Sequence, residues 1–334
     1  MIPLLLINGC QGIGTGWSTF IPQHSPRDVL NYIRAKLNGE IKLPLIRPWV
    51  RDFEGGITAD TEHNSYITEG KITPTSNSSV SITELPVGVW TNDYRNSLVN
   101  MMTKAEILSF SENHTTTKVS FDVKMNLSKL QKYLHGDIYN KFKLRNALST
   151  RNMHAFTTDM KIARYTSPEE IADAFFPIRL NLYDDRKFLL ECNMEYSARM
   201  MRNKARFIEA VSTDEINLLR GRKSKDATIA QLVQMEFAKH SELNAIKTKH
   251  KAATVANVSD SNELTIVDED SSSNDESTTD FDYLLNMPLS SLTMEKIDTL
   301  NEEAQKAEAK LSEIKNSSKE DLWNSDLDKL EPHF

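Results

Sequence analysis

The stretch Asn8-Gly-Cys-Gln-Gly-Ile-Gly-Thr-Gly-Trp-Ser-Thr-Phe-Ile-Pro22 is the most informative segment of this 334-residue chain. It holds four glycines within eight residues: Gly9, Gly12, Gly14 and Gly16. Because glycine lifts the steric limits on the backbone, such a run predicts a tight turn or a backbone that lies close to another molecule. One aliphatic side chain, Ile13, and one large aromatic side chain, Trp17, stand among these glycines.

Two nucleotide-binding motifs are disfavoured because each lacks a required residue. Gly9, Gly14 and Thr15 have the spacing of a phosphate-binding loop, but the lysine that contacts the phosphates is missing. A dinucleotide-binding fingerprint would need a third glycine where Trp17 stands. The glycines taken by themselves leave a plainer alternative open, which is an ordinary turn after an apolar strand at Leu4–Ile7.

The charge of the chain is unevenly distributed. The formal net charge is −7, but residues 255–334 hold 20 acidic and 6 basic side chains. Residues 1–254 therefore hold the remaining 27 acidic and 34 basic side chains, a balance of +7. A mildly basic body followed by an acidic segment is compatible with contact to phosphate, and equally with an ordinary solvated surface.

Composition also excludes several classes of protein. Two cysteines, Cys10 and Cys192, are too few for a disulfide scaffold and indicate a reducing compartment. No stretch is long and apolar enough to span a bilayer, so we expect no membrane partner. None of the eight histidines lies at ligand spacing from a cysteine or aspartate, so we expect no metal site.

Hydrophobic periodicity predicts the first half of the fold. Ser25 and Pro26 form a helix start, and Asn38-Gly39 ends that helix. Residues 56–90 alternate between apolar and polar side chains and are expected to be rich in β-strands, including one at Ser79–Thr83. A further strand is predicted at Lys118–Val123.

The second half reads as helical. A capping box at Ser167 starts a long helix or a helix pair that continues to about Val211. Pro177 lies inside it and predicts a kink, at a cost of about 3 kcal/mol unless packing compensates. Residues 255–280 are predicted to form a disordered acidic linker. Two sets of apolar residues are predicted to form packed faces, one after Ser167 and one that packs on another helix of the chain: Ile171, Phe175, Ile178 and Leu182; Ile297, Leu300, Ala304, Ala307, Leu311 and Ile314.

A series of motifs follows the glycine-rich stretch in a fixed order: Pro48-Trp-Val-Arg-Asp-Phe-Glu-Gly-Gly-Ile57, Ile82-Thr-Glu-Leu-Pro86, Phe142-Lys-Leu144, Lys161-Ile-Ala-Arg-Tyr165, Ser167 to Lys187, Asp282-Tyr-Leu-Leu-Asn-Met-Pro-Leu289 and Asp321-Leu-Trp-Asn-Ser-Asp-Leu327. From end to end, the chain resembles the eukaryotic type IIA DNA topoisomerases. The resemblance is to the C-terminal part of their DNA breakage-reunion core, without the ATPase, TOPRIM and catalytic-tyrosine regions.

The resemblance implies a mixed α/β fold: the end of a winged-helix module, an α/β tower, and long antiparallel coiled-coil helices with a helical dimer gate. The implied segments are the winged-helix piece with its DNA-wedge loop at 1–22, the tower at 23–165, a coiled-coil arm at 166–254, the acidic linker at 255–280, and the gate segment with a return helix at 281–334.

Two DNA-binding sites carry over from the family by resemblance. Ile13, between Gly12 and Gly14, matches the isoleucine that wedges between base pairs and bends the duplex. The second site is a tower segment whose side chains are expected to contact phosphates without reading sequence: Lys143, Arg145, Ser149, Thr150, Arg151 and Asn152. The gate is expected to include Tyr283, Leu284, Leu285 and Met287.

The resemblance also bears on partners and catalysis. It implies double-stranded DNA, a second copy of this chain or a full-length topoisomerase II as partners, and a nuclear location. The family enzyme passes duplexes through one another with ATP and Mg²⁺, but its nucleophilic tyrosine and Mg²⁺-binding cluster have no counterpart in this sequence. Arg164-Tyr165 matches a structural position, and Asp268-Glu-Asp270 lies in the acidic linker. We therefore expect this chain by itself to bind no cofactor and to leave DNA uncleaved.

Three functions remain open at this point. The chain could be part of a type II topoisomerase, or a truncated gene product of that family. It could instead be a non-catalytic DNA-binding and dimerising protein that regulates the full-length enzyme. A coiled-coil scaffold without DNA would account for residues 166–334 but not for Ile13 or the tower motifs.

Overall fold

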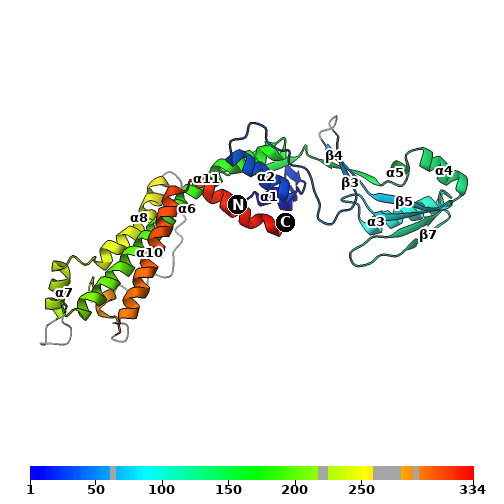
Figure 1. The fold of residues 1–334 in the computed structure, drawn as a ribbon. Helices are drawn as coiled ribbons and strands as arrows, with labels where there is room; N and C mark the ends of the chain where they lie inside the picture. Colours follow the sequence, from blue (N-terminus) through cyan, green and yellow to red (C-terminus); the bar gives the residue numbers. More distant parts are fainter. Residues whose placement is uncertain (61–64, 217–224, 259–279, 289–292) are drawn as a thin grey trace. The chain divides into compact units, whose positions relative to one another are not determined.

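The computed structural model describes residues 1–60, 65–216, 225–258, 280–288 and 293–334. These residues form two compact units, residues 1–178 with 326–334 and residues 179–325 (Figure 1). Each unit is described by itself below. Across the described residues, no helix has the length and apolar character needed to cross a bilayer.

The first unit is a mixture of short helices and small antiparallel sheets. Its helices are α1 (Leu4–Asn8), α2 (Pro26–Leu37), α3 (Thr91–Thr103), α4 (Leu127–His135), α5 (Ile138–Lys141), the start of α6 (Pro168–Ser212), the end of α11 (Lys319–Leu330) and the 3-10 turn η2 (Glu331–His333). Its strands are β1 (Cys10–Gly14), β2 (Trp17–Ile21), β3 (Gly56–Asp60), β4 (Ser65–Glu69), β5 (Lys71–Ser76), β6 (Ser79–Glu84), β7 (Ser109–Glu112), β8 (Phe121–Lys124), β9 (Arg145–Ser149), β10 (Met153–Phe156) and β11 (Ile162–Tyr165). They pair as β1-β2, β10-β11, β3-β4-β9 and β5-β6-β8-β7.

The predicted strand at Leu4–Ile7 is wrong, because these residues form helix α1. Leu6 is fully buried whereas Leu4 is 65% exposed, so the two side chains occupy different environments. A run of four apolar residues does not distinguish a buried strand from one turn of helix. The prediction failed because the apolar run is too short to show a helical or a strand period.

Helix α2 confirms the prediction made from Ser25 and Pro26. The Ser25 side chain accepts the backbone N–H of Asp28 at 3.3 Å, and Pro26 stands at the first helical position. Val29 and Ile33 are completely buried along one face. The sequence signals for the start, the end and the buried side of this helix agree with one another, which explains why it was predictable.

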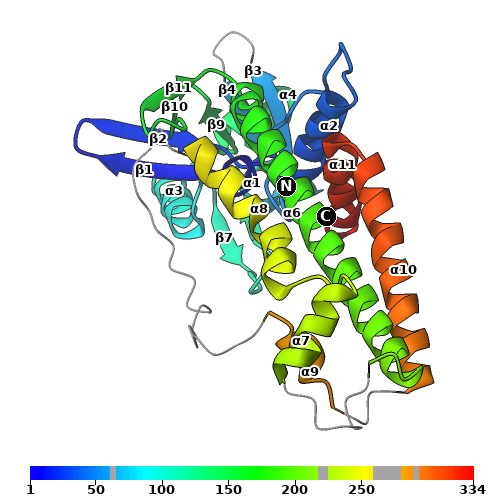
Figure 2. The same cartoon turned by 90° about the vertical axis from the view of Figure 1, so that its left-hand side faces the viewer.

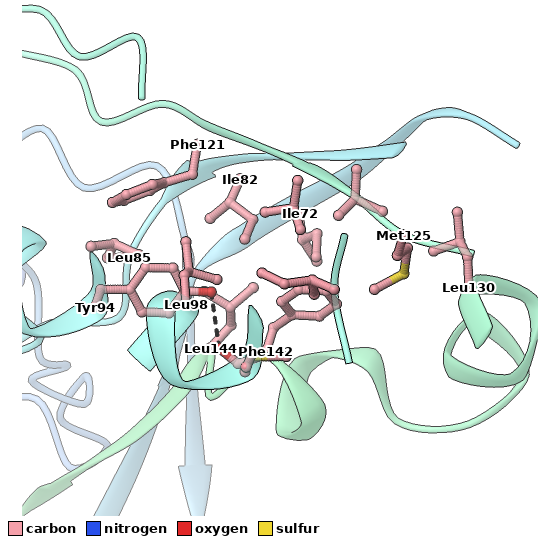
Figure 3. Packing of buried hydrophobic residues seen from close by; sticks show 14 residues of the cluster. Ile72, Ile82, Leu85, Tyr94, Leu98, Phe121, Met125, Leu130, Phe142 and Leu144 are labelled. Atoms are coloured by element: carbon pink, nitrogen blue, oxygen red, sulfur yellow. Dashed lines mark hydrogen bonds between the residues drawn. The ribbon is translucent and has the colours of Figure 1, made fainter. Parts of the chain in front are cut away.

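The four-stranded sheet and the helices beside it enclose a hydrophobic core (Figure 3). Strand β6 confirms the predicted strand at Ser79, whereas β8 begins three residues later than predicted, at Phe121. The Tyr94 hydroxyl donates to the Phe142 carbonyl oxygen at 3.0 Å inside this core, and burial raises the pKa of its phenol. The single polar atom that the tyrosine brings into the core is thereby satisfied.

The second unit consists of helices. They are the rest of α6, then α7 (Lys225–Gln234), α8 (His240–Val258), α9 (Asp282–Leu285), α10 (Met294–Asn316) and the start of α11. Helices α6 and α10 run antiparallel (Figure 2): Lys187 donates to the Ser317 carbonyl near one end, and Ile208 packs with Ile297 near the other. The predicted packing of the seam that begins at Ile297 on another helix of the same chain is confirmed.

The predicted long helix forms, but its predicted buried face does not extend along it. Pro177 lies within α6, which runs continuously from Pro168 to Ser212. Of the four residues predicted to form one buried face, Ile171 is buried, but Ile178 and Leu182 are 42% and 49% exposed. The expectation of a single face was therefore wrong beyond the first turns, because it assumed one packing partner along the whole helix.

The predicted linker at 255–280 falls almost entirely outside the described residues. Helix α8 continues to Val258, so the first residues of that segment are helical. Residues 259–279 lie outside the described part of the chain.

Candidate nucleic-acid interface

The glycine-rich stretch forms a two-stranded hairpin. Strands β1 and β2 pair from Cys10 with Ile21 up to Gly14 with Trp17. Thr15 and Gly16 then make a two-residue turn, in which Gly16 has a φ of +80°, a backbone conformation that glycine adopts without a steric cost. The Ile13 side chain, one residue from the turn, is 90% exposed. An aliphatic side chain that is this exposed gains nothing from the fold of its own chain.

The base of the hairpin is fixed by a glycine and a buried histidine. Gly9 has a φ of +66°, and a Cβ atom there would lie 2.8 Å from the carbonyl oxygen of Ile21. His24 is fully buried, and its Nδ1 lies 3.3 Å from the carbonyl oxygen of Leu6. Since a carbonyl oxygen only accepts, Nδ1 carries the proton. Nε2 has no hydrogen-bond partner among the described residues, and burial lowers the pKa of this imidazole.

The predicted wedge and part of the predicted tower segment come together, although they are more than 130 residues apart. The backbone N–H of Phe20 donates to the carbonyl oxygen of Asn152 at 2.8 Å. The Asn152 side-chain amide donates to the Ser18 hydroxyl, also at 2.8 Å. The Thr19 hydroxyl donates to the carbonyl oxygen of His154 at 2.8 Å. These bonds attach the hairpin to residues 152–154 along one edge.

The other predicted contacts divide into two groups. Ser149 and Arg151 are exposed at the end of β9, next to Asn152, whereas Thr150 is only 7% exposed. Arg145 lies at the opposite end of β9, roughly 13 Å from Ser149 at about 3.3 Å per residue, and Lys143 lies two residues before that strand. The structure therefore brings Ser149–Asn152 to the hairpin and leaves the two other cations apart from it.

Arg145 is already paired within the chain. Its guanidinium forms ion pairs with Glu69, at 2.6 Å, and with Asp137. The hydrogen bond to the Glu69 carboxylate is the main cause that raises the pKa of this guanidinium. Lys143, in contrast, is exposed and has no ion pair within the described residues. Of these two cations, Lys143 is the one that remains available to a phosphate.

Comparison with known proteins identifies the family to which this arrangement belongs. The family of the A subunits of DNA gyrase/topoisomerase IV matches residues 1–328. The chain belongs to this family. Its relatives include DNA topoisomerase 2 of Plasmodium falciparum and of Arabidopsis thaliana, which are 33% and 34% identical to it over 338 residues. DNA topoisomerase 2-beta of Homo sapiens is 33% identical over 333 residues.

The match covers nearly all of this topoisomerase-family chain but less than a quarter of each of these relatives. It covers 99% of the chain and 23% of the Plasmodium and Arabidopsis proteins, and 98% of the chain and 20% of the human protein. A solved structure, the DNA-binding, cleavage and re-ligation domain of Plasmodium falciparum topoisomerase II, superposes with a TM-score of 0.81 at 32% identity. That superposition covers 99% of this chain and 43% of the solved one. The mixed α/β fold with its long helix is the fold of that domain.

Arg164 and Tyr165, which are expected to have a structural role, lie in β11. Tyr165 pairs with Met153 of β10, and the Arg164 Nε donates to the carbonyl oxygen of Arg151 at 3.1 Å. Among the described residues no three His, Cys, Asp or Glu side chains converge on a possible metal position. The acidic run Asp268-Glu-Asp270 lies outside these residues.

The expected gate residues contribute to the core of the second unit. Leu284 is fully buried, and Tyr283, Leu285 and Met287 pack against the same cluster. The Tyr283 hydroxyl donates to the carbonyl oxygen of Ala238 at 2.6 Å, and burial raises its pKa to about 12. Leu284 is thus enclosed by its own chain, whereas Tyr283, Leu285 and Met287 are half-buried.

Sequence reasoning missed a set of exposed apolar residues beside the hairpin. Trp17 is 55% exposed, Phe156 63% and Ile162 41%, and the Trp17 ring meets the His154 ring edge-on at 5.6 Å. The alternation of Met153-His-Ala-Phe156 was the available signal, since it predicts that His154 and Phe156 share a face.

Proposed function

We propose that this chain contributes the DNA-binding and DNA-bending surface of a type II DNA topoisomerase. The single observation that carries the proposal is the position of Ile13, which is 90% exposed at the end of a hairpin that is bonded to Asn152. An apolar wedge held by a braced hairpin can unstack one base step, and the lost stacking is offset by contacts of the bent duplex with more protein surface.

The remaining contacts position the duplex. Arg151 and Lys143 meet phosphates, and Ser149 and Asn152 add hydrogen bonds to the backbone. Such contacts read no sequence, which suits an enzyme that acts on crossings of duplexes. Thr150, being buried, supports the loop from below.

We place the chain in an enzyme that passes one duplex through another in an ATP-dependent reaction, relaxes and decatenates DNA, and works in the nucleus. Residues 1–22 form the end of a winged-helix module, 23–165 the tower, 166–254 a coiled-coil arm, and 281–334 the gate and return helix of a dimer. The Mg²⁺ and ATP chemistry belongs to the rest of the enzyme.

The proposal is tested by binding the chain to a short duplex labelled at both ends for fluorescence energy transfer. Wild type is expected to shorten the end-to-end distance, and Ile13→Ala to bind without bending. Ile41→Ala is the matched control, because Ile41 is an exposed isoleucine outside the hairpin. The proposal fails if wild type does not bind at low salt, or if Ile13→Ala bends the duplex as wild type does.

A further inference from the structure

Two glycines of the hairpin are not required by the fold of the chain itself. Gly12 and Gly14 lie in β1 with no positive φ. A Cβ atom at either position would meet nothing nearer than 3.9 Å. A Cβ atom would therefore fit at both positions, and a residue that carries one would favour the strand, since glycine weakens a strand interior. Their absence leaves an open surface for something outside the chain to approach.

That open surface is the floor of an apolar groove of about 560 Å³. Gly14 pairs with Trp17, and on the neighbouring hairpin Phe156 pairs with Ile162. Paired residues share a face of a sheet, so Phe156 and Ile162 project from one side of their hairpin. Both residues line the groove, as do Gly14 and Trp17. Ile13 is also among the residues that line the groove, so the groove adjoins the proposed wedge.

Two cations adjoin residues that line the groove: Lys161 precedes Ile162, and Arg164 pairs with His154 across the hairpin. Lys161 and Arg164 of the β10–β11 hairpin are exposed, and neither forms an ion pair with a carboxylate among the described residues. The Arg164 Nε donates to the carbonyl oxygen of Arg151 at 3.1 Å. Asp159 is the only acidic residue between Met153 and Tyr165. An apolar floor with a cationic rim suits a polyanion that has apolar edges, which is the chemistry of a nucleic acid.

We infer that this groove is a second DNA-contact site, which receives the sugar–phosphate wall of the minor groove beside the wedged base step. Trp17, Phe156 and Ile162 pack against deoxyribose rings, while Lys161 and Arg164 bind the adjoining phosphates. The inference rests on the proposed function, because it needs the duplex to lie on the hairpin. It adds the β10–β11 hairpin to the proposed DNA-contact surface. It also explains why residues 12 and 14 are glycines, because side chains there would fill the groove.

The sharpest test is Gly12→Val, which fills the groove floor. We expect its thermal midpoint to equal or exceed that of wild type, since valine favours a strand, while its affinity for a 30-base-pair duplex falls roughly tenfold. Phe156→Ala removes apolar contact and is expected to weaken binding without a change in salt dependence. The double variant Lys161→Gln/Arg164→Gln is expected to make the negative slope of log K against log salt less steep by about 1.8, which is about 0.9 for each lost phosphate contact.

The control is Lys132→Gln, an exposed lysine in α4 with no ion pair among the described residues, which is expected to leave affinity and slope unchanged. If the three groove variants bind with wild-type affinity and slope while Ile13→Ala still abolishes bending, this inference is overturned and the proposed function stands. If wild type does not bind the duplex, both fail together.

Discussion

The backbone N–H of Phe20 donates to the carbonyl oxygen of Asn152 at 2.8 Å, across 132 residues of sequence. This bond joins the hairpin that carries Ile13 to the loop that carries Arg151. Together with the bonds from Asn152 to Ser18 and from Thr19 to His154, it sets the spacing between the proposed wedge and the proposed phosphate contacts. Neither segment would be positioned for DNA without the other.

The Asn152 side chain is predicted to stiffen this junction. Asn152→Ala removes the bond to the Ser18 hydroxyl but keeps the backbone bond to Phe20. We expect about 1 kcal/mol of lost stability and a smaller bend angle in bound DNA, measured by energy transfer. Asn113→Ala, which also removes one exposed side-chain bond, is the control and should leave the bend unchanged. Equal bending by both variants would contradict the bracing role.

Gly9 is predicted to be irreplaceable at the base of the hairpin. Gly9→Ala combines a positive φ with a Cβ atom 2.8 Å from the carbonyl oxygen of Ile21. Gly39→Ala has nearly the same φ, +70°, but nothing within 4 Å. Both variants carry backbone strain of about 1 kcal/mol, and Gly9→Ala should lose clearly more stability because of the clash. A thermal midpoint for Gly9→Ala at or above that of Gly39→Ala would refute this account.

His24 is predicted to make the first unit sensitive to acid. Burial lowers its pKa in the folded state below the ordinary value near 6.5, although Glu169 and Asp28 act in the opposite direction. The neutral form is thus the one that the fold favours, so its contribution is complete above pH about 6.5 and is lost as the pH falls through the folded-state pKa.

Denaturant titrations at pH 7.5 and 5.5 test this sensitivity. Wild type should lose stability on acidification, and His24→Gln should lose less. His135→Gln, at an exposed histidine, should behave as wild type does. If wild type and His24→Gln respond identically to acid, the buried imidazole is not the sensor.

The antiparallel helix pair is predicted to depend on packing far more than on its ion pair. Leu300 is 5% exposed and packs with Ile208 and Ala205, so Leu300→Ala should cost about 2–5 kcal/mol. Arg202 and Glu308 form a bidentate pair that lowers the pKa of Glu308, but their side chains are 58% and 39% exposed. Glu308→Gln should therefore cost less than about 1 kcal/mol in urea unfolding. A larger loss for Glu308→Gln than for Leu300→Ala would reverse this ranking.

Elements with several agreeing local signals could be predicted from the sequence. Helix α2 has a cap, a proline at its first position and a periodic face, and the seam from Ile297 has strict helical spacing. The strand expected at Leu4 failed because four apolar residues carry no period. Ile178 and Leu182 were wrongly predicted to be buried, because the local sequence does not show which segment packs against each part of a helix.

The candidate site was predictable only in part. Ile13 could be named from its motif, but its junction with Asn152 depends on a contact across 132 residues that no local pattern contains. Arg145 is predicted to contact phosphate, but its ion pairs with Glu69 and Asp137 come from distant segments that no local pattern indicates. The groove beside Trp17 was missed because its walls come from two hairpins that are distant in sequence.

The most direct measurement is the fluorescence of 2-aminopurine placed at successive positions of a bound duplex. This base brightens when its stacking is lost, so it reports a wedge at single-step resolution. The account predicts a rise confined to one base step with wild type, and none with Ile13→Ala, while Ile41→Ala behaves as wild type does. A uniform signal along the duplex, or the same local rise with Ile13→Ala, would contradict the claim that Ile13 is the wedge.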